Sequence, residues 1–330
     1  MLSNVRTGPA FVSIVVPFYN EGEGVAVFYQ TLCPVLAAIP DTRFEVVCVD
    51  DGSHDDTLRH LVTIARNDTR FVVIELSRNF GKEAALTAGI DASRGDAVVP
   101  IDADLQDPPS LLHQMIAEWR KGAEVVLARR IDRSTDSFIK RKAAEAFYRV
   151  HNSLSDVKIP ENVGDFRLMD KCVVDALKCL PERQRFMKGL FAWVGYHSVT
   201  VDYSRGARAA GKTKFSGWRL WNFALEGITS FSTAPLKIWT YLGGIGAMAA
   251  VLYACFVVIR TLAFGADVPG YASMLVLILF FGSLQLISVG LLGEYIGRVY
   301  IETKQRPSYL IRRLYRTNDA SQPDGNEDTG

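Results

Sequence analysis

Acidic side chains occur in closely spaced pairs at two places in the first third of the chain. Asp50 and Asp51 follow one apolar run, and Asp102 and Asp104 follow another. Like charges repel, so paired carboxylates at the end of a buried strand need a partner that stabilises them. Mg²⁺ binds through one or two carboxylates and completes its shell with waters and substrate phosphates. The pattern therefore favours a divalent-cation site for Mg²⁺ or Mn²⁺ over the alternative of two solvated turns.

Apolar runs alternate with amphipathic stretches through residues 11–130. The runs are short, rich in Val and Ile and apolar throughout, as in strands buried on both faces. This alternation predicts an α/β fold with a mostly parallel sheet, helices on both faces and ligands at the carboxyl ends of the strands. Asp107 is expected to cap the last helix, and residues 138–200 are expected to be mainly helical. The expected strands are 11–16, 44–50, 71–76, 97–102 and 125–129, and the expected helices are 23–38, 55–66, 82–93 and 109–121.

Two long stretches in the last third carry no charged residue, namely 238–259 and 268–293. Each exceeds the roughly 20 residues that a helix needs to cross a bilayer core. Polar and turn-forming residues separate them, which predicts a hairpin of transmembrane helices at 235–260 and 270–296. The alternative is a pair of helices buried in a soluble core. Two such stretches in close succession favour the membrane.

Positive charge is expected to set the orientation of this hairpin, because cytoplasmic flanks are enriched in Lys and Arg. The connecting loop has only Arg260, so the large N-terminal part and both termini are expected on the cytoplasmic side of a bacterial inner membrane. Residues 216–234, with Trp218 and Trp221, are typical of a helix in the membrane interface; a helix packed on the soluble domain is the alternative. The segment 297–330 is expected to be basic and to end in a disordered tail. The flanking cations are Lys212, Lys214, Arg219 and Lys237 before the hairpin, and Arg298, Lys304, Arg306, Arg312 and Arg313 after it.

Bulk properties limit the other classes of function. The net charge of +1 over 330 residues gives no general affinity for nucleic acid. The five cysteines form no CxxC pair, which is typical of buried thiols in a reducing compartment rather than of a disulfide framework or a zinc site. The N-terminus shows no cleavable signal peptide.

Several strings of residues resemble a known family. Pro17-Phe-Tyr-Asn-Glu21, Val49-Asp-Asp-Gly-Ser53 and Asp102-Ala-Asp104 resemble glycosyltransferase family 2, which has the nucleotide-diphospho-sugar transferase (GT-A type) fold. The longer strings are similar to those of the polyprenyl-phosphate glycosyltransferases, and with the two-span tail most similar to the bactoprenol (undecaprenyl-phosphate) glucosyltransferases. The resemblance covers residues 11–313. These longer strings are Leu76–Lys82, Asp102–Pro109, Gly164–Met169, Arg185–Gly189 and Gly211–Phe215.

The resemblance implies a role for each matching position. The base and ribose of a nucleotide-sugar would be bound by the first loop and the first acidic pair, with Lys82 reaching the diphosphate. Asp104 would hold the metal with Asp102 beside it, and Asp165 would be the catalytic acidic residue. Cations near the membrane would meet the acceptor phosphate. The nucleotide-sugar set is Pro17, Tyr19, Glu21, Asp50, Asp51, Lys82 and Asp102, and the acceptor set is Arg167, Arg208, Lys212 and Lys214.

The implied reaction is the transfer of a hexose from a nucleotide-sugar to a polyprenyl phosphate, with inversion by single displacement. Glucose from UDP-glucose is the first expectation. UDP-galactose, a UDP-N-acetylhexosamine, a UDP-pentose and GDP-mannose stay open as donors. A non-catalytic membrane scaffold that binds nucleotide-sugar is the alternative from another class. The expected domains are a glycosyltransferase domain at 1–215, the interfacial segment, the two spans and the basic tail, in a homo-oligomer without nucleic acid.

Overall fold

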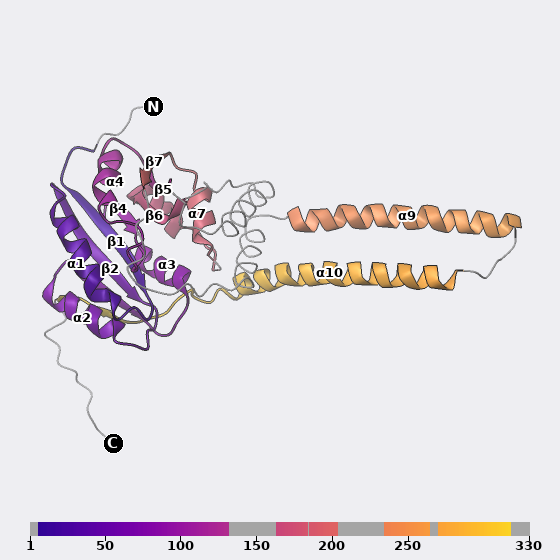
Figure 1. Cartoon of the computed structure of the whole chain (residues 1–330), viewed down its shortest axis with the longest axis horizontal. Helices are drawn as coiled ribbons and strands as arrows, with labels where there is room; N and C mark the ends of the chain where they lie inside the picture. Colours follow the sequence, from indigo (N-terminus) through magenta and orange to yellow (C-terminus); the bar gives the residue numbers. More distant parts are fainter. Residues whose placement is uncertain (1–5, 132–162, 184, 204–233, 265–269, 318–330) are drawn as a thin grey trace, which may run out of the picture.

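The computed structural model describes residues 6–131, 163–183, 185–203, 234–264 and 270–317. These residues form an α/β domain and two long helices that run side by side away from it (Figure 1).

A mixed sheet of eight strands lies at the centre of the α/β domain. Its order is β7-β5-β6-β4-β1-β2-β3-β8. Neighbours among β1 to β4 are parallel, as the sequence predicts, whereas β6 runs antiparallel to both β4 and β5, and β8 runs antiparallel to β3. The strands are β1 Ala10–Phe18, β2 Thr42–Asp50, β3 Phe71–Leu76, β4 Ala97–Pro100, β5 Val125–Arg130, β6 Val163–Asp170, β7 Ser198–Tyr203 and β8 Ile311–Tyr315.

Helices cover both faces of this sheet because successive strand residues point to opposite sides. Ile14 belongs to the core under α1, α2 and α4, whereas its neighbour Val15 belongs to the core under α3, α6 and α7. The prediction of helices on both faces is therefore confirmed. The first layer consists of α1 Gly24–Ala37, α2 Thr57–Asn67 and α4 Leu111–Arg120, and the second of α3 Lys82–Ala92, α6 Lys171–Lys178 and α7 Met187–Trp193.

The helix α3 lies close against the middle of the sheet. A Cβ atom at Gly89 would come within 2.2 Å of Val15 Cγ1, so only glycine permits this approach. Because α3 starts at Lys82, the close packing brings its first turn to the edge of the sheet where β1 and β2 end.

Two local expectations are wrong. Asp107 does not cap α4, which begins at Leu111 after Ser110 without a side-chain cap; its carboxylate instead accepts a hydrogen bond from the Tyr203 hydroxyl. The expectation of mainly helix in residues 138–200 misses β6 and the first half of β7, which belong to the part of the sheet beyond β4. In both cases a partner distant in sequence determines the structure.

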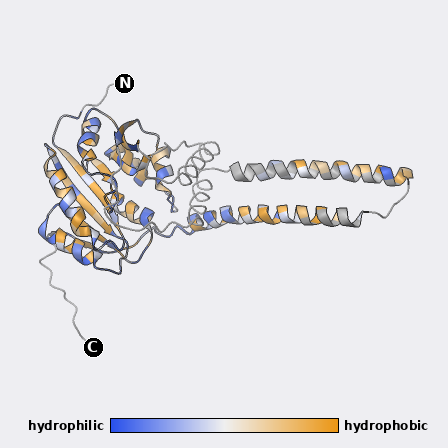
Figure 2. Cartoon of the chain, in the orientation of Figure 1, coloured by the Kyte–Doolittle hydropathy of each residue, from blue (hydrophilic) through white to orange (hydrophobic). Residues whose placement is uncertain are grey.

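The two long helices are α9, Ala234–Phe264, and α10, Tyr271–Lys304. They correspond to the expected spans, although α10 runs further toward the C-terminus. Within the described residues, one stretch is long and apolar enough to cross a membrane, namely Phe280–Lys304. Apolar residues recur along both helices (Figure 2), and many of their large side chains are exposed. The expected interfacial helix at 216–234 lies almost wholly outside the described residues.

The chain returns to the sheet after α10. Strand β8 pairs with β3, and the buried Glu75 carboxylate accepts hydrogen bonds from Tyr315 Oη at 2.8 Å and from Arg312 at 3.1 Å. Thr317 Oγ1 donates to the Ala65 carbonyl at 2.8 Å. The segment after the second long helix thus forms an edge strand of the sheet in the α/β domain, which the sequence did not indicate.

Candidate active site

A cavity of about 440 Å³ lies where β1, β2 and β4 end and α3 begins. This is the edge at which a parallel sheet presents its ligand site. The sequence predicted that two acidic pairs would meet there, and one member of the first pair and both of the second line the cavity. The expected site residues in its wall are Pro17, Tyr19, Glu21, Asp51, Lys82, Asp102 and Asp104.

The loop after β2 is held by the first acidic pair. Asp51 accepts hydrogen bonds from the backbone N–H groups of Phe80 at 2.7 Å and Gly81 at 2.9 Å. Gly52 has a φ of 67°, and a Cβ there would come within 2.5 Å of the Arg78 backbone. The loop therefore packs tightly on residues 78–81 and fixes the start of α3 beside the cavity.

Asp50 lies directly below this loop and is 1% exposed. One of its oxygens accepts from the Ser53 N–H at 3.2 Å, and the other, Oδ1, is buried without a hydrogen-bond partner among the described residues. Burial raises the pKa of both Asp50 and Asp51, and the backbone N–H donors partly offset this.

Lys82 joins two carboxylates that the sequence assigned to different roles. Its Nζ lies 2.7 Å from Asp102 Oδ1 and 2.9 Å from Asp165 Oδ2. Burial alone would lower the pKa of Lys82, but the two carboxylates raise it above its ordinary value. Lys82 is therefore charged at neutral pH, and it is not an isolated surface lysine.

The two carboxylates respond differently to the same lysine. Burial raises the pKa of Asp102, and the charges of Asp165 and Asp104 add to that rise against the effect of Lys82. Burial also acts on Asp165, yet the positive charges of Lys82 and Lys188 hold its pKa below the usual range. Asp165 is the more firmly ionised of the two.

Asp165 and Arg167 lie on one face of β6, as expected for an extended segment. The side chain of Asp165 is 16% exposed, and its Oδ1 has no hydrogen-bond partner among the described residues. Arg167 is 6% exposed, donates to the Gly164 carbonyl at 2.7 Å and stacks 4.2 Å from the Phe191 ring centroid. The positive charge of Arg167 therefore acts on the site from a buried position.

Two functional candidates were missed at the sequence level. Glu83, next to Lys82, accepts a hydrogen bond from the Met187 N–H at 3.2 Å, and burial together with the charge of Asp165 raises its pKa to about 7. Lys188 lowers the pKa of both Asp165 and Glu83. Lys188 lies in the string Arg185–Gly189, and the resemblance of that string to the family was the signal that could have identified it.

The second acidic pair fits a divalent cation. Asp104 lines the cavity, and its carboxylate accepts from Gln106 N at 3.2 Å, which orients it. The pKa values of Asp102 and Glu21 are raised in part by the charge of Asp104, so negative charge is concentrated here. No group of three acidic, His or Cys ligands occurs in the described ranges, but Mg²⁺ needs only one or two carboxylates when substrate phosphates complete its shell.

The remaining predicted residues are placed differently. Tyr19 is 43% exposed at the rim of the cavity, where a flat ring can cover a nucleobase. The backbone N–H of Glu21 donates to Thr57 Oγ1 at 2.9 Å, which anchors the first loop to α2. Arg208, Lys212 and Lys214 lie outside the described residues, and their assignment stays a prediction.

Comparison with known proteins places these residues in a wider group. The family model "Glycosyl transferase family 2" matches residues 13–177, and the model "GtrB C-terminal hairpin" matches residues 234–299. The chain is 52% identical to the SfII prophage-derived bactoprenol glucosyl transferase of Shigella flexneri, over 93% of this chain and 99% of the relative. It is 52% identical to a prophage bactoprenol glucosyl transferase homolog of Escherichia coli K12, over 92% and 99%, and 51% identical to an uncharacterised glycosyltransferase of Synechocystis, over 92% and 95%.

Proposed function

The chain belongs to glycosyltransferase family 2, and on that premise we propose that it transfers glucose from UDP-glucose to undecaprenyl phosphate. The product would be a lipid-linked monosaccharide for the modification of cell-envelope glycans. Relatives named bactoprenol glucosyl transferases, similar over nearly their whole length, support the acceptor and the sugar.

The observation that carries the proposal is the bridge from Asp102 through Lys82 to Asp165 beside the nucleotide-sized cavity. A donor diphosphate that leaves with extra negative charge needs positive charge nearby, and Lys82 supplies it at a fixed position. The same lysine keeps Asp165 ionised and oriented toward the sugar. The side chain of Lys82 thus connects the donor-binding and the sugar-reacting parts of the site.

The donor is proposed to enter with its base between Tyr19 and the loop of Asp50 and Asp51. Its diphosphate would then lie over the second acidic pair. Asp102 and Asp104 would hold a Mg²⁺ or Mn²⁺ ion there, which when bound supplies Lewis-acid stabilisation of the leaving diphosphate. Lys82, held beside this acidic pair by Asp102 and Asp165, would donate to the diphosphate.

The chemical step is a single displacement. An oxygen of the acceptor phosphate attacks the anomeric carbon, a new C–O bond forms, and the bond to the UDP oxygen breaks. The acceptor phosphate has a second pKa of about 6, so it is largely ionised at neutral pH and needs no strong base. Asp165 therefore acts as an orienting group, with Oδ1 available to accept a hydrogen bond from a sugar hydroxyl. By family resemblance, the α-linked donor gives a β-linked product.

Bringing two anionic substrates together costs electrostatic energy, which cations must offset. Arg167 and Lys188 carry positive charge at the described side of the site. Arg208, Lys212 and Lys214 are proposed to add theirs from the segment before α9. In this arrangement the acceptor headgroup would meet the donor between β6 and the membrane.

The two long helices support a proposed membrane placement. They are antiparallel neighbours, so the start of α9 and the end of α10 lie at the same end of the pair (Figure 1). We place 235–260 and 270–296 across a bacterial inner membrane as a hairpin, 216–234 in the interface, and the domain of 1–215 and the segment of 297–330 in the cytoplasm. The enzyme would work as a homo-oligomer at the headgroup level of its lipid substrate.

The test is a panel of radiolabelled nucleotide-sugars offered with undecaprenyl phosphate and Mg²⁺ to the purified full-length protein. The proposal expects a lipid-linked monosaccharide from UDP-glucose at a rate at least tenfold above that from UDP-galactose, a UDP-N-acetylhexosamine, a UDP-pentose or GDP-mannose. A different preferred donor would overturn the sugar assignment. Donor binding without any turnover would support the scaffold instead.

A further inference from the structure

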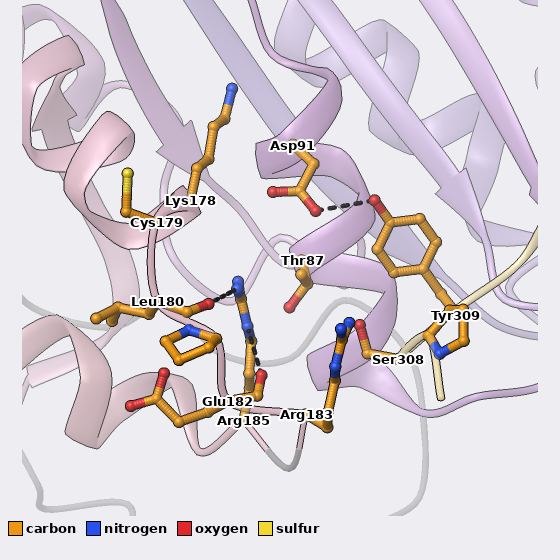
Figure 3. A pocket seen from close by; sticks show the side chains of 12 residues that line it. Thr87, Asp91, Lys178, Cys179, Leu180, Glu182, Arg183, Arg185, Ser308 and Tyr309 are labelled. Carbon is orange, nitrogen blue, oxygen red and sulfur yellow. Dashed lines mark hydrogen bonds between the residues drawn. The ribbon is translucent and has the colours of Figure 1, made fainter. Parts of the chain in front are cut away.

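A second cavity, of about 460 Å³, lies outside the candidate active site (Figure 3). Three parts of the chain form its wall: Thr87 and Asp91 on α3, the connection between α6 and α7, and the segment that follows α10. The predictions from sequence assigned no role to any of these side chains. The cavity lies where α10 joins the α/β domain.

Three cationic side chains line this second cavity, namely Lys178, Arg183 and Arg185. Arg185 donates hydrogen bonds to the carbonyl oxygens of Leu180 at 2.8 Å and Glu182 at 3.2 Å, which fixes its charge in the wall. Lys178 donates to the Ser93 carbonyl at 3.2 Å. The guanidinium of Arg183 has no hydrogen bond or ion pair within the described part of the chain, so it is available to an anion.

Two carboxylates also line the cavity, and only one of them is satisfied. Asp91 accepts a hydrogen bond from Tyr309 Oη at 2.8 Å, and burial together with this carboxylate raises the pKa of Tyr309. Glu182 Oε2 is buried and has no hydrogen-bond partner among the residues described. A buried carboxylate oxygen without a donor is costly. Within the described residues, the wall of the cavity thus holds an arginine side chain without an ion-pair partner and a glutamate with one buried, unsatisfied oxygen, and the two do not bond to each other.

The position of the cavity links it to the membrane. The Arg183 N–H donates to both carboxylate oxygens of Glu302, at 3.0 and 3.1 Å, in the last turn of α10. The apolar stretch Phe280–Lys304 ends there, and the chain then passes directly into the cavity wall at Pro307. A group at the membrane surface is therefore within reach of this opening.

We propose that this cavity binds an aminoalkyl phosphate, the chemistry of a phosphoethanolamine lipid headgroup. The phosphate would bind the guanidinium of Arg183 in the field of Arg185 and Lys178, because charge-assisted Arg–phosphate hydrogen bonds are strong. The ammonium would donate to Glu182. The lipid source rests on the membrane placement proposed above, whereas the chemistry of the cavity does not.

Binding of a headgroup in this second cavity would have a structural consequence for the candidate active site. The occupant would hold the segment after α10 against α3 at Thr87 and Asp91. Lys82 begins the same helix, so the headgroup would help to fix the helix that carries the bridging lysine relative to the bilayer.

The experiment measures binding to the purified full-length protein in detergent, without donor or acceptor. The probes are short-chain phosphatidylethanolamine, short-chain phosphatidylcholine and free O-phosphoethanolamine. Phosphatidylcholine has the same net charge but no N–H donor, so it isolates the contribution of Glu182. The variants are Arg183→Gln and Glu182→Gln, with Arg59→Gln as control, an exposed arginine on α2 that pairs only with Asp56.

The expected result is about tenfold tighter binding of phosphatidylethanolamine than of phosphatidylcholine. Glu182→Gln should abolish this preference, Arg183→Gln should weaken both lipids about tenfold, and Arg59→Gln should behave as the unmodified chain. If free O-phosphoethanolamine binds as tightly as the lipid, the result would support an aminoalkyl-phosphate site and show that its ligand is a soluble compound rather than a lipid. Equal binding of the two lipids, or unchanged binding by Arg183→Gln, would overturn the proposal.

The outcome is separable from that of the proposed function. A chain that transfers no sugar but shows the Arg183-dependent preference leaves this inference standing. A chain that transfers sugar normally and binds neither lipid overturns this inference alone. Arg183→Gln removes no side-chain interaction within the described residues, and its backbone bond to Glu302 remains, so thermal unfolding should be unchanged and serves as the folding check.

Discussion

The ammonium of Lys82 donates a hydrogen bond of 2.9 Å to Asp165, a residue 83 positions later in the chain. The two side chains come from α3 and from β6, so the contact joins the two halves of the catalytic domain. It also explains how a carboxylate with little solvent access stays ionised. The bond makes Lys82 a residue whose removal should affect binding and catalysis together.

Replacing Lys82 with methionine keeps the length of the side chain and removes its charge. Asp102 and Asp165 would then lie close together without a cation, and we expect a loss of 10²- to 10³-fold in turnover, typical of a lost electrostatic contact to the transition state. Lys82→Arg should retain part of the rate. The measurement is glucosyl transfer to undecaprenyl phosphate under saturating donor.

The pH dependence gives this substitution a second readout. Lys82 contributes to the lowered pKa of Asp165, so the acid limb of the rate profile should move to higher pH in Lys82→Met. An unchanged acid limb, with only a uniform loss of rate, would show that Asp165 does not titrate under the control of Lys82.

Glu83 should make stability depend on pH. Its folded-state pKa of about 7 lies above the unfolded value of 4.5, so the folded state holds the extra proton between these values. Stability is therefore expected to fall as pH rises from about 4.5 to 7, by roughly 1–2 kcal/mol after allowance for screening. Glu83→Gln keeps an acceptor for the Met187 N–H and should flatten the profile.

Thermal unfolding between pH 5 and pH 8 checks this prediction. Glu118→Gln is the control, because Glu118 lies near the end of α4 and its ion-pair partner among the described residues is Lys121. A wild-type melting temperature that rises over this range, or the same slope in Glu83→Gln, would show that Glu83 does not cause the pH dependence of stability.

Removing the metal carboxylate should abolish transfer. We expect Asp104→Ala to lower turnover at least about 100-fold, because the leaving diphosphate loses its cation. EDTA should have the same effect on the wild-type protein, and Mg²⁺ or Mn²⁺ should restore it. Asp56→Asn, which changes an exposed aspartate directly before α2, should leave the rate intact. Product formed by Asp104→Ala in EDTA would contradict the metal role.

Lys214 is predicted to meet the acceptor. Its loss should raise the KM for undecaprenyl phosphate about tenfold and leave the KM for UDP-glucose unchanged, since one charge-assisted phosphate contact is removed. Initial rates against each substrate in turn separate the two values. A KM that rises for the donor rather than for the lipid would assign Lys214 to donor binding instead of acceptor binding.

The parts of the fold that depend on local pattern were predictable. The first five strands and four helices follow from short apolar runs and amphipathic stretches, and the structure confirms them within a few residues. The same reasoning predicted that Asp51, Asp102 and Asp104 lie at one edge of the sheet, because the carboxyl ends of parallel strands lie together. These features need no knowledge of distant contacts.

The parts that depend on distant partners were not predictable. Strand β6 contains Gly164, Asp165 and Arg167, which interrupt any apolar run, yet it pairs with β4 and β5 in the interior of the sheet. The contact between Lys82 and Asp165 also depends on β6, because Asp165 lies in that strand. Arg312 and Arg313 were interpreted only as cytoplasmic charges, although both lie in β8 and Arg312 binds Glu75.

The pairing of β8 with β3 predicts that the C-terminal segment stabilises the catalytic domain. Glu75 is 7% exposed and accepts from Tyr315 and Arg312, so Tyr315→Phe removes one donor and leaves a buried carboxylate oxygen short of a partner. Such a loss costs about 1–3 kcal/mol. Thermal or urea unfolding of the full-length protein in detergent measures it.

A matched variant distinguishes the hydrogen bond from general disturbance. Tyr300→Phe removes the hydroxyl of an exposed tyrosine on α10, for which the described residues provide no hydrogen-bond acceptor, and should leave stability within about 0.5 kcal/mol. If the hydroxyl of Tyr315 holds β8 on the sheet, Tyr315→Phe should also expose the backbone N–H groups of β3 to hydrogen exchange. Unaltered exchange at Val73 and Glu75, together with wild-type stability, would mean that β8 is not needed to hold this edge of the sheet.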